Sequence, residues 1–109
     1  MKIAFLYAGQ GSQRVGMGRD LYDASPAFRA AFDAGHLDFD LHALCFEGAQ
    51  ETLNQTQYTQ PCMVAFACGV TAALFDAGLR PDYVAGLSLG EYSALEASGV
   101  LTAQSAIEL

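Results

Sequence analysis

Basic residues are scarce in this chain, and their scarcity excludes two kinds of partner. The 109 residues include 5 Lys and Arg against 12 Asp and Glu, which gives a formal net charge of −7. The basic residues are scattered and form no cluster: Lys2, Arg14, Arg19, Arg29 and Arg80. Nucleic acids and anionic membrane surfaces both bind clustered Lys and Arg. We therefore expect neither nucleic acid nor a membrane as a partner.

The cysteines are too few to form a framework of disulfide bonds or a zinc site. Cys45, Cys62 and Cys68 are odd in number, and no two of them have Cys-x-x-Cys spacing. This pattern fits neither a set of disulfide bonds nor a zinc site, and it predicts free thiols in a reducing compartment. The apolar run that follows Met1 and Lys2 is too short for a signal peptide, so we expect a cytoplasmic protein.

Hydrophobic runs long enough to span a membrane are also absent. The longest run, Pro61 to Phe75, has about 15 residues, whereas a bilayer requires about 20. Gly69 and Thr71 interrupt it. We expect a buried helix that is capped by Thr59 and ends at Gly78.

The remaining composition favours a buried α/β interior, because 52% of the residues are hydrophobic and only 16% are charged. The patterns predict strands over 3–7 and 83–85. They predict helices over 20–22, 26–34, 41–46, 61–75 and 91–97, and a last helix that Thr102 caps, with one helical turn within 49–58. Both strands have the apolar character of strands buried on both faces of a parallel sheet. Such a sheet needs more strands, so we expect residues 1–109 to be the amino-terminal part of a larger α/β domain.

The most informative motif is Gly86-Leu87-Ser88-Leu89-Gly90, which lies between the second strand and a helix. It fits the Gly-x-Ser-x-Gly nucleophile elbow, a sharp turn whose flanking positions have no room for a side chain and which exposes the serine hydroxyl. The backbone N–H of Leu89 follows the serine at the start of the helix, where it is an oxyanion donor in elbow enzymes. The alternative is an ordinary strand-to-helix turn with a serine that has no role.

A glycine-rich loop, Gly9-Gln10-Gly11-Ser12-Gln13, follows the first strand. It fits neither nucleotide-binding template, because Arg14 replaces the third glycine of the dinucleotide fingerprint and the Walker lysine is missing. A loop at the carboxyl end of a strand is a favoured ligand position in open α/β sheets. Gln10 can offer an amide N–H to an oxyanion there, or it is a structural turn residue.

A serine nucleophile needs a base, and the sequence does not identify one. Both histidines, His36 and His42, precede Ser88, whereas α/β-hydrolases place the histidine after the serine. We interpret both as surface or loop residues without an orienting carboxylate partner. Glu91 is explained more simply by the helix dipole than by acid–base chemistry.

Together these motifs resemble the malonyl-CoA:acyl-carrier-protein transacylases and the acyltransferase domains of fatty-acid and polyketide synthases. The likeness covers essentially the whole chain in the same order. The residues that carry it are the loop 8–13 with Gly16-Met17-Gly18, then Leu53-Asn54 and Thr59-Gln60-Pro61, and the extended elbow 86–95.

The resemblance implies an α/β-hydrolase-like core, with a ferredoxin-like subdomain that is absent from this chain. It implies that Ser88 becomes acylated by malonyl-CoA and that Gln10 and the Leu89 backbone bind the oxyanion. The thiol of an acyl carrier protein then takes the malonyl group, with no metal or tightly held cofactor. The family's base histidine and its carboxylate-binding arginine lie downstream and have no counterpart here. Leu87 stands where many members have histidine, which makes the surroundings of the serine less polar.

Two other functions are compatible with the same motifs. A serine esterase or thioesterase uses the same elbow but transfers the acyl group to water. A catalytically inactive fragment, or an association module that uses its unpaired sheet edge, needs no base at all.

Overall fold

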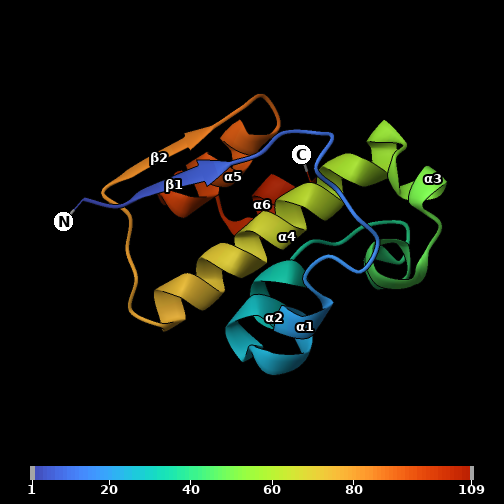
Figure 1. Cartoon of the computed structure of the whole chain (residues 1–109), viewed down its shortest axis with the longest axis horizontal. Helices are drawn as coiled ribbons and strands as arrows, with labels where there is room; N and C mark the ends of the chain where they lie inside the picture. The colour runs from blue at the N-terminus through green and yellow to red at the C-terminus, as the bar shows by residue number, and fades with distance from the viewer. Residues whose placement is uncertain (1, 109) are drawn as a thin grey trace.

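The computed structural model describes residues 2–108, which form helices packed on a two-stranded parallel sheet (Figure 1). In chain order the elements are β1 (Ala4–Tyr7), α1 (Arg19–Ala24), α2 (Pro26–Phe32), the π-helical turn η1 (Ala43–Glu47), α3 (Gln50–Leu53), α4 (Thr56–Asp76), β2 (Tyr83–Gly86), α5 (Gly90–Ala97) and α6 (Ala103–Glu108). The predicted order of strands and helices is confirmed, although several bounds differ.

The sheet brings together two segments that are far apart in the sequence. β1 and β2 run parallel, with Phe5 opposite Val84 and Tyr7 opposite Gly86. Helices α1 to α4 lie in the connection between the two strands, as expected because parallel neighbours require a long crossover. At the start of the ladder, the N–H of Ile3 donates to the side chain of Asp82, the residue before β2, at 2.7 Å.

The prediction that both strands are buried on both faces is wrong for the part of the chain described. On one face, the Tyr7 hydroxyl lies 2.6 Å from the Thr71 hydroxyl of α4, and Phe5 stacks on Phe75. On the other face, Leu6 is 78% exposed and Tyr83 is 62% exposed. The difference arises because α4 and α5 cover one face and no residue of 2–108 covers the other.

Helix α4 begins earlier than the sequence suggests. Gln55 occupies its N-cap position, and the Gln55 carbonyl accepts a hydrogen bond from the Thr59 N–H at 2.8 Å. Thr59 is therefore inside the helix, and its predicted role as cap is wrong. Its buried hydroxyl donates to the carbonyls of Leu53 and Gln55 instead, while Pro61 lies within the helix.

The additional turn makes α4 long enough, by length and composition, to cross a membrane. It has 21 residues, and an 18-residue window has a mean hydropathy of 1.3 with 44% of that window buried. The helix packs against α2, α5 and α6. A helix that is surrounded by other elements needs apolar residues on several faces, so the predicted buried helix accounts for this composition.

The hydrophobic core lies between α2 and α4 and extends to η1 and α3. Its fully buried side chains include Phe28, Phe32, Cys45, Leu53 and Cys62. The predicted start of α2 is confirmed, because the Ser25 hydroxyl accepts the Phe28 N–H at 3.1 Å. The core is thus formed by the helices that connect β1 to β2 and not by the strands.

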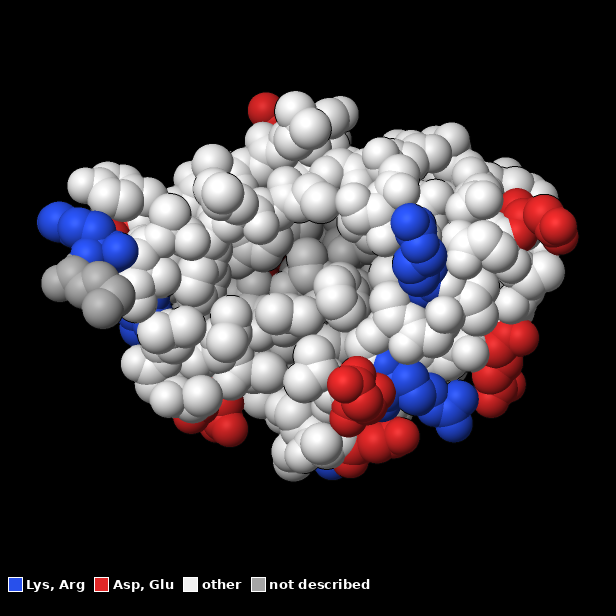
Figure 2. Space-filling view, viewed as in Figure 1, with Lys and Arg blue, Asp and Glu red and all other residues white. Residues whose placement is uncertain are grey.

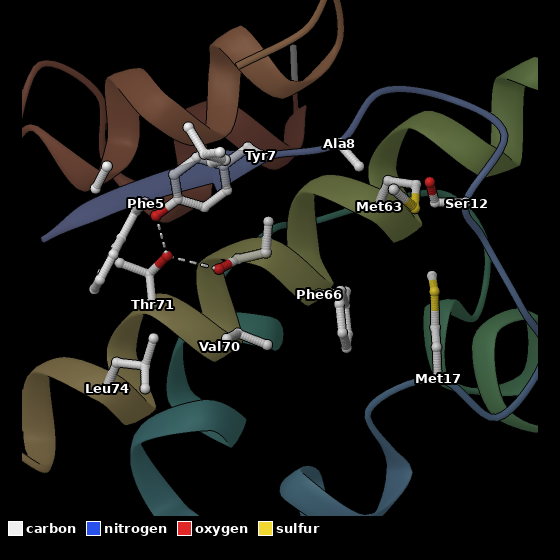
Figure 3. A pocket seen from close by; sticks show the side chains of 13 residues that line it. Phe5, Tyr7, Ala8, Ser12, Met17, Met63, Phe66, Val70, Thr71 and Leu74 are labelled. Atoms are coloured by element: carbon white, nitrogen blue, oxygen red, sulfur yellow. Dashed lines mark hydrogen bonds between the residues drawn. The ribbon is translucent and has the colours of Figure 1, made fainter. Parts of the chain in front are cut away.

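An apolar groove of about 510 Å³ runs between β1 and α4 (Figure 3). Phe66, Val70 and Leu74 of α4 line one side, and Ser12 and Met17 of the loop after β1 lie at one end. Most of the surface around this hollow is uncharged. Most charged side chains of the same face lie toward its margins, although one basic side chain stands on the face to the right of the hollow (Figure 2).

The carboxyl group of Glu96 on α5 lies in the interface with α4. Its Oε1 atom is buried and has no hydrogen-bond partner among the described residues, and the Cys68 thiol of α4 lies near the carboxyl group. Burial raises the pKa of Glu96, because the ionised form loses hydration, and the nearby Cys68 thiol opposes this shift in part. Burial and the neighbouring Glu96 also raise the pKa of the Cys68 thiol.

The core assignment predicts a large difference between two leucines. Leu53 is fully buried, so Leu53→Ala should lower the free energy of unfolding by about 2–5 kcal/mol through lost contacts and a cavity. Leu6→Ala removes the same atoms from a side chain that is 78% exposed, and we expect a change of about 0.5 kcal/mol or less. Urea unfolding measures both. Equal losses would contradict the assignment of the core.

The buried carboxyl group predicts that stability falls as the pH rises. The folded-state pKa of Glu96 lies above its ordinary value of 4.5, so its contribution is complete below that value and is lost as the pH rises through the folded pKa. Glu96→Gln should remove this part of the pH dependence when urea unfolding is measured from about pH 4 to about pH 8. Glu91→Gln, on the exposed side of the same helix, is the control. A Glu96→Gln profile that parallels the wild type would refute the assignment.

Candidate active site

The carboxyl ends of β1 and β2 lie side by side, so two loops leave the sheet at the same edge. The Leu87 N–H extends the ladder beyond β2 by donating to the Tyr7 carbonyl at 3.1 Å. Ligands of open parallel sheets bind at this edge. The loop that carries Gln10 and the turn that carries Ser88 therefore start from neighbouring positions.

Ser88 lies in a tight turn between β2 and α5 and has an unusual backbone conformation. Its φ angle is 53°, and within residues 2–108 it is the one residue other than glycine with a positive φ. This left-handed conformation costs about 1–3 kcal/mol in a residue with a side chain, and it occurs preferentially at functional sites. Ser88 is exposed, so the turn presents its hydroxyl to solvent.

The predicted need for glycine on both sides of this serine is confirmed by backbone crowding. A Cβ atom at Gly86 would lie 2.1 Å from the carbonyl carbon and oxygen of Gly90. A Cβ atom at Gly90 would lie 2.2 Å from the carbonyl oxygen of Tyr7. The first turn of α5 therefore packs directly on both strand ends, which any larger residue at either position would prevent.

The loop after β1 passes close to this turn. A Cβ atom at Gly9 would lie 2.7 Å from the Leu87 carbonyl oxygen and 4.0 Å from the Leu89 backbone nitrogen. The side-chain Nε2 of the next residue, Gln10, donates to the Thr56 hydroxyl at 3.1 Å. Among residues 2–108, the backbone N–H groups of Gln10 and Leu89 have no hydrogen-bond acceptor. Two free backbone donors thus belong to adjacent segments beside Ser88.

Leu89 and Leu87 differ in their surroundings although both flank the serine. Leu89 is only 8% exposed and packs in the core at the start of α5, which fixes its backbone. Leu87 is 75% exposed, so its side chain lies on the surface next to Ser88. The less polar neighbour predicted from the sequence is therefore exposed beside the serine.

The interpretation of the histidines requires one correction. His42 has a carboxylate partner, because its Nε2 lies 2.5 Å from Asp33 Oδ1, and its ring packs on Tyr22. His36 is exposed, and its backbone N–H donates to Glu108 at 2.7 Å. Spacing in the sequence could not reveal the partner of His42, since the chain reverses direction between α2 and η1. No contact among the described residues joins either histidine to Ser88.

Sequence reasoning gave no role to Gln13 and Asn54, which the structure places beside the loop. Gln13 is only 6% exposed, and its side chain donates to Asn54 at 2.9 Å. For Gln13, the signal in the sequence was the polar stretch that directly follows the first strand. Within residues 2–108, no group of three or more His, Cys, Asp and Glu side chains is arranged to hold a metal ion.

The fold and the turn define an α/β protein with an exposed serine at a strand-to-helix turn beside two free backbone N–H groups. The chain belongs to the acyl transferase domain family, whose model matches residues 4–109.

Three similar proteins illustrate this membership. The malonyl CoA-acyl carrier protein transacylase of Bacillus subtilis strain 168 is 44% identical over 108 residues, which cover 97% of this chain and 34% of that protein. The crystal structure of MCAT from Streptococcus pneumoniae matches with a TM-score of 0.91 and 48% identity, covering 97% of this chain and 35% of that one. A malonyl-transacylase solved in complex with its type II polyketide acyl-carrier protein matches with a TM-score of 0.90 and 39% identity, covering 98% and 36%. The chain thus spans about a third of the length of the relatives it matches.

The left-handed backbone of Ser88 predicts that glycine at this position is more stable than alanine. Ser88→Gly should be more stable than Ser88→Ala by about 1–2 kcal/mol, because glycine adopts a left-handed conformation without a steric cost. Urea unfolding of the two variants measures the difference, and both lack the hydroxyl. Gly99, which also has a positive φ, provides the converse control, since Gly99→Ala should be destabilising. Equal stability of the two Ser88 variants would contradict the left-handed turn.

Proposed function

We propose that this chain carries the nucleophile and the oxyanion donors of an acyltransferase. The complete protein would transfer a malonyl group from CoA to the phosphopantetheine thiol of an acyl carrier protein, in fatty-acid or polyketide biosynthesis. The observation that carries the proposal is the left-handed, exposed Ser88 at a turn that requires glycine two residues before it and two residues after it. The relatives named as malonyl transacylases support the choice of acyl group and acceptor.

The proposed reaction has two steps. The Ser88 oxygen attacks the thioester carbonyl, its proton passes to a base, and the negative charge that develops on the carbonyl oxygen is bound by the N–H groups of Gln10 and Leu89. The C–S bond then breaks and CoA leaves. In the second step the carrier thiol attacks the acyl-serine ester, and the serine hydroxyl is restored.

Several parts of this scheme lie outside the residues described. The resemblance assigns the base to a downstream histidine and the contact with the malonyl carboxylate to a downstream arginine, within an α/β-hydrolase-like core that holds a ferredoxin-like subdomain. Carrier proteins are generally acidic, and this chain has a net charge of −7, so a basic docking surface belongs to another part of the protein. We propose a cytoplasmic enzyme that uses no metal or tightly bound cofactor.

Incubation with malonyl-CoA tests the first step. We expect mass spectrometry to find a malonyl adduct on Ser88 that forms slowly in this chain, because Ser-His-Asp enzymes that lack one member of the triad keep a residual acceleration of about 10³–10⁴-fold over water. Ser88→Ala should give no adduct, and Ser93→Ala, which removes a buried serine of α5, should still react.

Addition of a holo carrier protein tests the second step. Transfer to the carrier thiol that is faster than hydrolysis supports the transferase. Hydrolysis that remains dominant with the carrier present would identify an esterase or thioesterase instead. A chain that forms no adduct at all under these conditions would be the inactive fragment or association module.

A further inference from the structure

Side-chain amides fasten the loop after β1 to the segment 50–56, which comprises α3 and the start of α4. The Gln13 Oε1 atom accepts the Gly11 N–H at 2.8 Å, and its Nε2 donates to Asn54 Oδ1 at 2.9 Å. The same Asn54 oxygen accepts from Gln50 Nε2 at 2.9 Å. Gln50 completes the connection, because its Oε1 accepts the Val15 N–H at 3.0 Å.

The direction of every bond in this network follows from the two backbone N–H groups at its ends. A backbone N–H can only donate, so Gly11 and Val15 each require an amide oxygen. The NH₂ groups of Gln13 and Gln50 then both face Asn54, which must present its oxygen to them. One arrangement of the three amides therefore satisfies all the bonds, and a reversal of any single amide would place like groups against each other.

This network determines how Gln10 is held. The peptide that follows Gln10 is fixed by the bond from Gly11 to Gln13, and the Gln10 side chain is fixed by Thr56 at 3.1 Å. The Gln10 backbone N–H is left without an acceptor among the described residues, next to the turn that carries Ser88. Oxyanion donors are effective when they are oriented before the reaction, so a fixed and free N–H is what the site requires.

We infer that Gln13 is a positioning residue for acylation of Ser88, with Asn54 as the acceptor that holds the Gln13 amide in place. Gln13 does not touch the acyl group. It fixes the peptide that follows Gln10. Together with the bond from the Gln10 side chain to Thr56, this restricts the Gln10 backbone, so that the Gln10 N–H in the preceding peptide faces the carbonyl oxygen on which negative charge develops. This inference rests on the proposed acyl transfer and adds two residues to its machinery.

Substitutions that differ in hydrogen-bonding ability test the inference in the full chain. Gln13→Leu removes both bonds, and Asn54→Leu, at an exposed position, removes only the acceptor. Asn54→Asp keeps oxygens for both NH₂ groups. Gln57→Leu replaces an exposed glutamine of α4 that is outside the network and is the matched control for Gln13→Leu.

Two measurements are made on each variant: the rate of Ser88 acylation as a function of malonyl-CoA concentration, and hydrogen exchange of the Gly11 N–H by NMR. We expect Gln13→Leu and Asn54→Leu to lower the maximal rate by about 10- to 100-fold, while the concentration for half-maximal rate stays within about twofold, because only charge stabilisation is impaired. Gly11 exchange should accelerate in both. Asn54→Asp should retain the wild-type rate within about threefold, and Gln57→Leu should leave both measurements unchanged.

Different results would overturn different parts of the scheme. If Gly11 exchange accelerates in both leucine variants while acylation keeps its wild-type rate, the network is merely structural and the positioning role is wrong. The role is also wrong if Asn54→Asp is as slow as Asn54→Leu. A wild-type chain that forms no adduct on Ser88 overturns the proposed acyl transfer and, with it, the positioning role. Urea unfolding of Asn54→Leu confirms that the rates refer to folded protein, and should Gln13→Leu not fold, Asn54→Leu and Asn54→Asp decide the question between them.

Discussion

The parallel pairing of β1 with β2 is the constraint on which the candidate site depends. Because Tyr7 lies opposite Gly86, the two strands end at the same level, and the segments that follow them leave the sheet at the same edge. The Leu87 N–H then bonds to the Tyr7 carbonyl, and Gly90 packs against the same carbonyl group. A shift of the register by one residue would separate Ser88 from the loop that carries Gln10.

The site combines local strain with support from elsewhere in the fold. The left-handed backbone of Ser88 and the crowded glycines are unfavourable by themselves, and surrounding structure must hold such a turn in place. That support comes from Leu89, which is buried in the core beside the turn, and from Gln13 on the other loop, whose amide donates to Asn54 at the end of α3. The large helix core around Phe28 is formed by the crossover connection, so much of the stability is provided by a region that takes no part in the chemistry.

Sequence patterns predicted the start of a helix well where the residues that determine it are close together in the sequence. The hydroxyl of Ser25 caps α2, and that of Thr102 accepts the N–H of Ser105 at 3.1 Å as predicted for the last helix. The start of α4 was wrong, since Thr59 has the residue type of a cap but is buried inside the helix. The partner of His42 could not be predicted, because residues of two different elements meet only after the chain has folded back.

The sequence by itself determined the Gly-x-Ser-x-Gly turn, because only glycine fits against backbone at 86 and 90 and this requirement is readable as residue type. It also determined the two strands and the glutamine-containing loop that follows the first. Tertiary structure alone decided which donors are free. Thr56 and Asn54, whose positions are set by the packing of α3 and α4, accept from the side chains of Gln10 and Gln13 and so hold the loop after β1 in place. These contacts join residues far apart in the chain, and only the folded structure shows them.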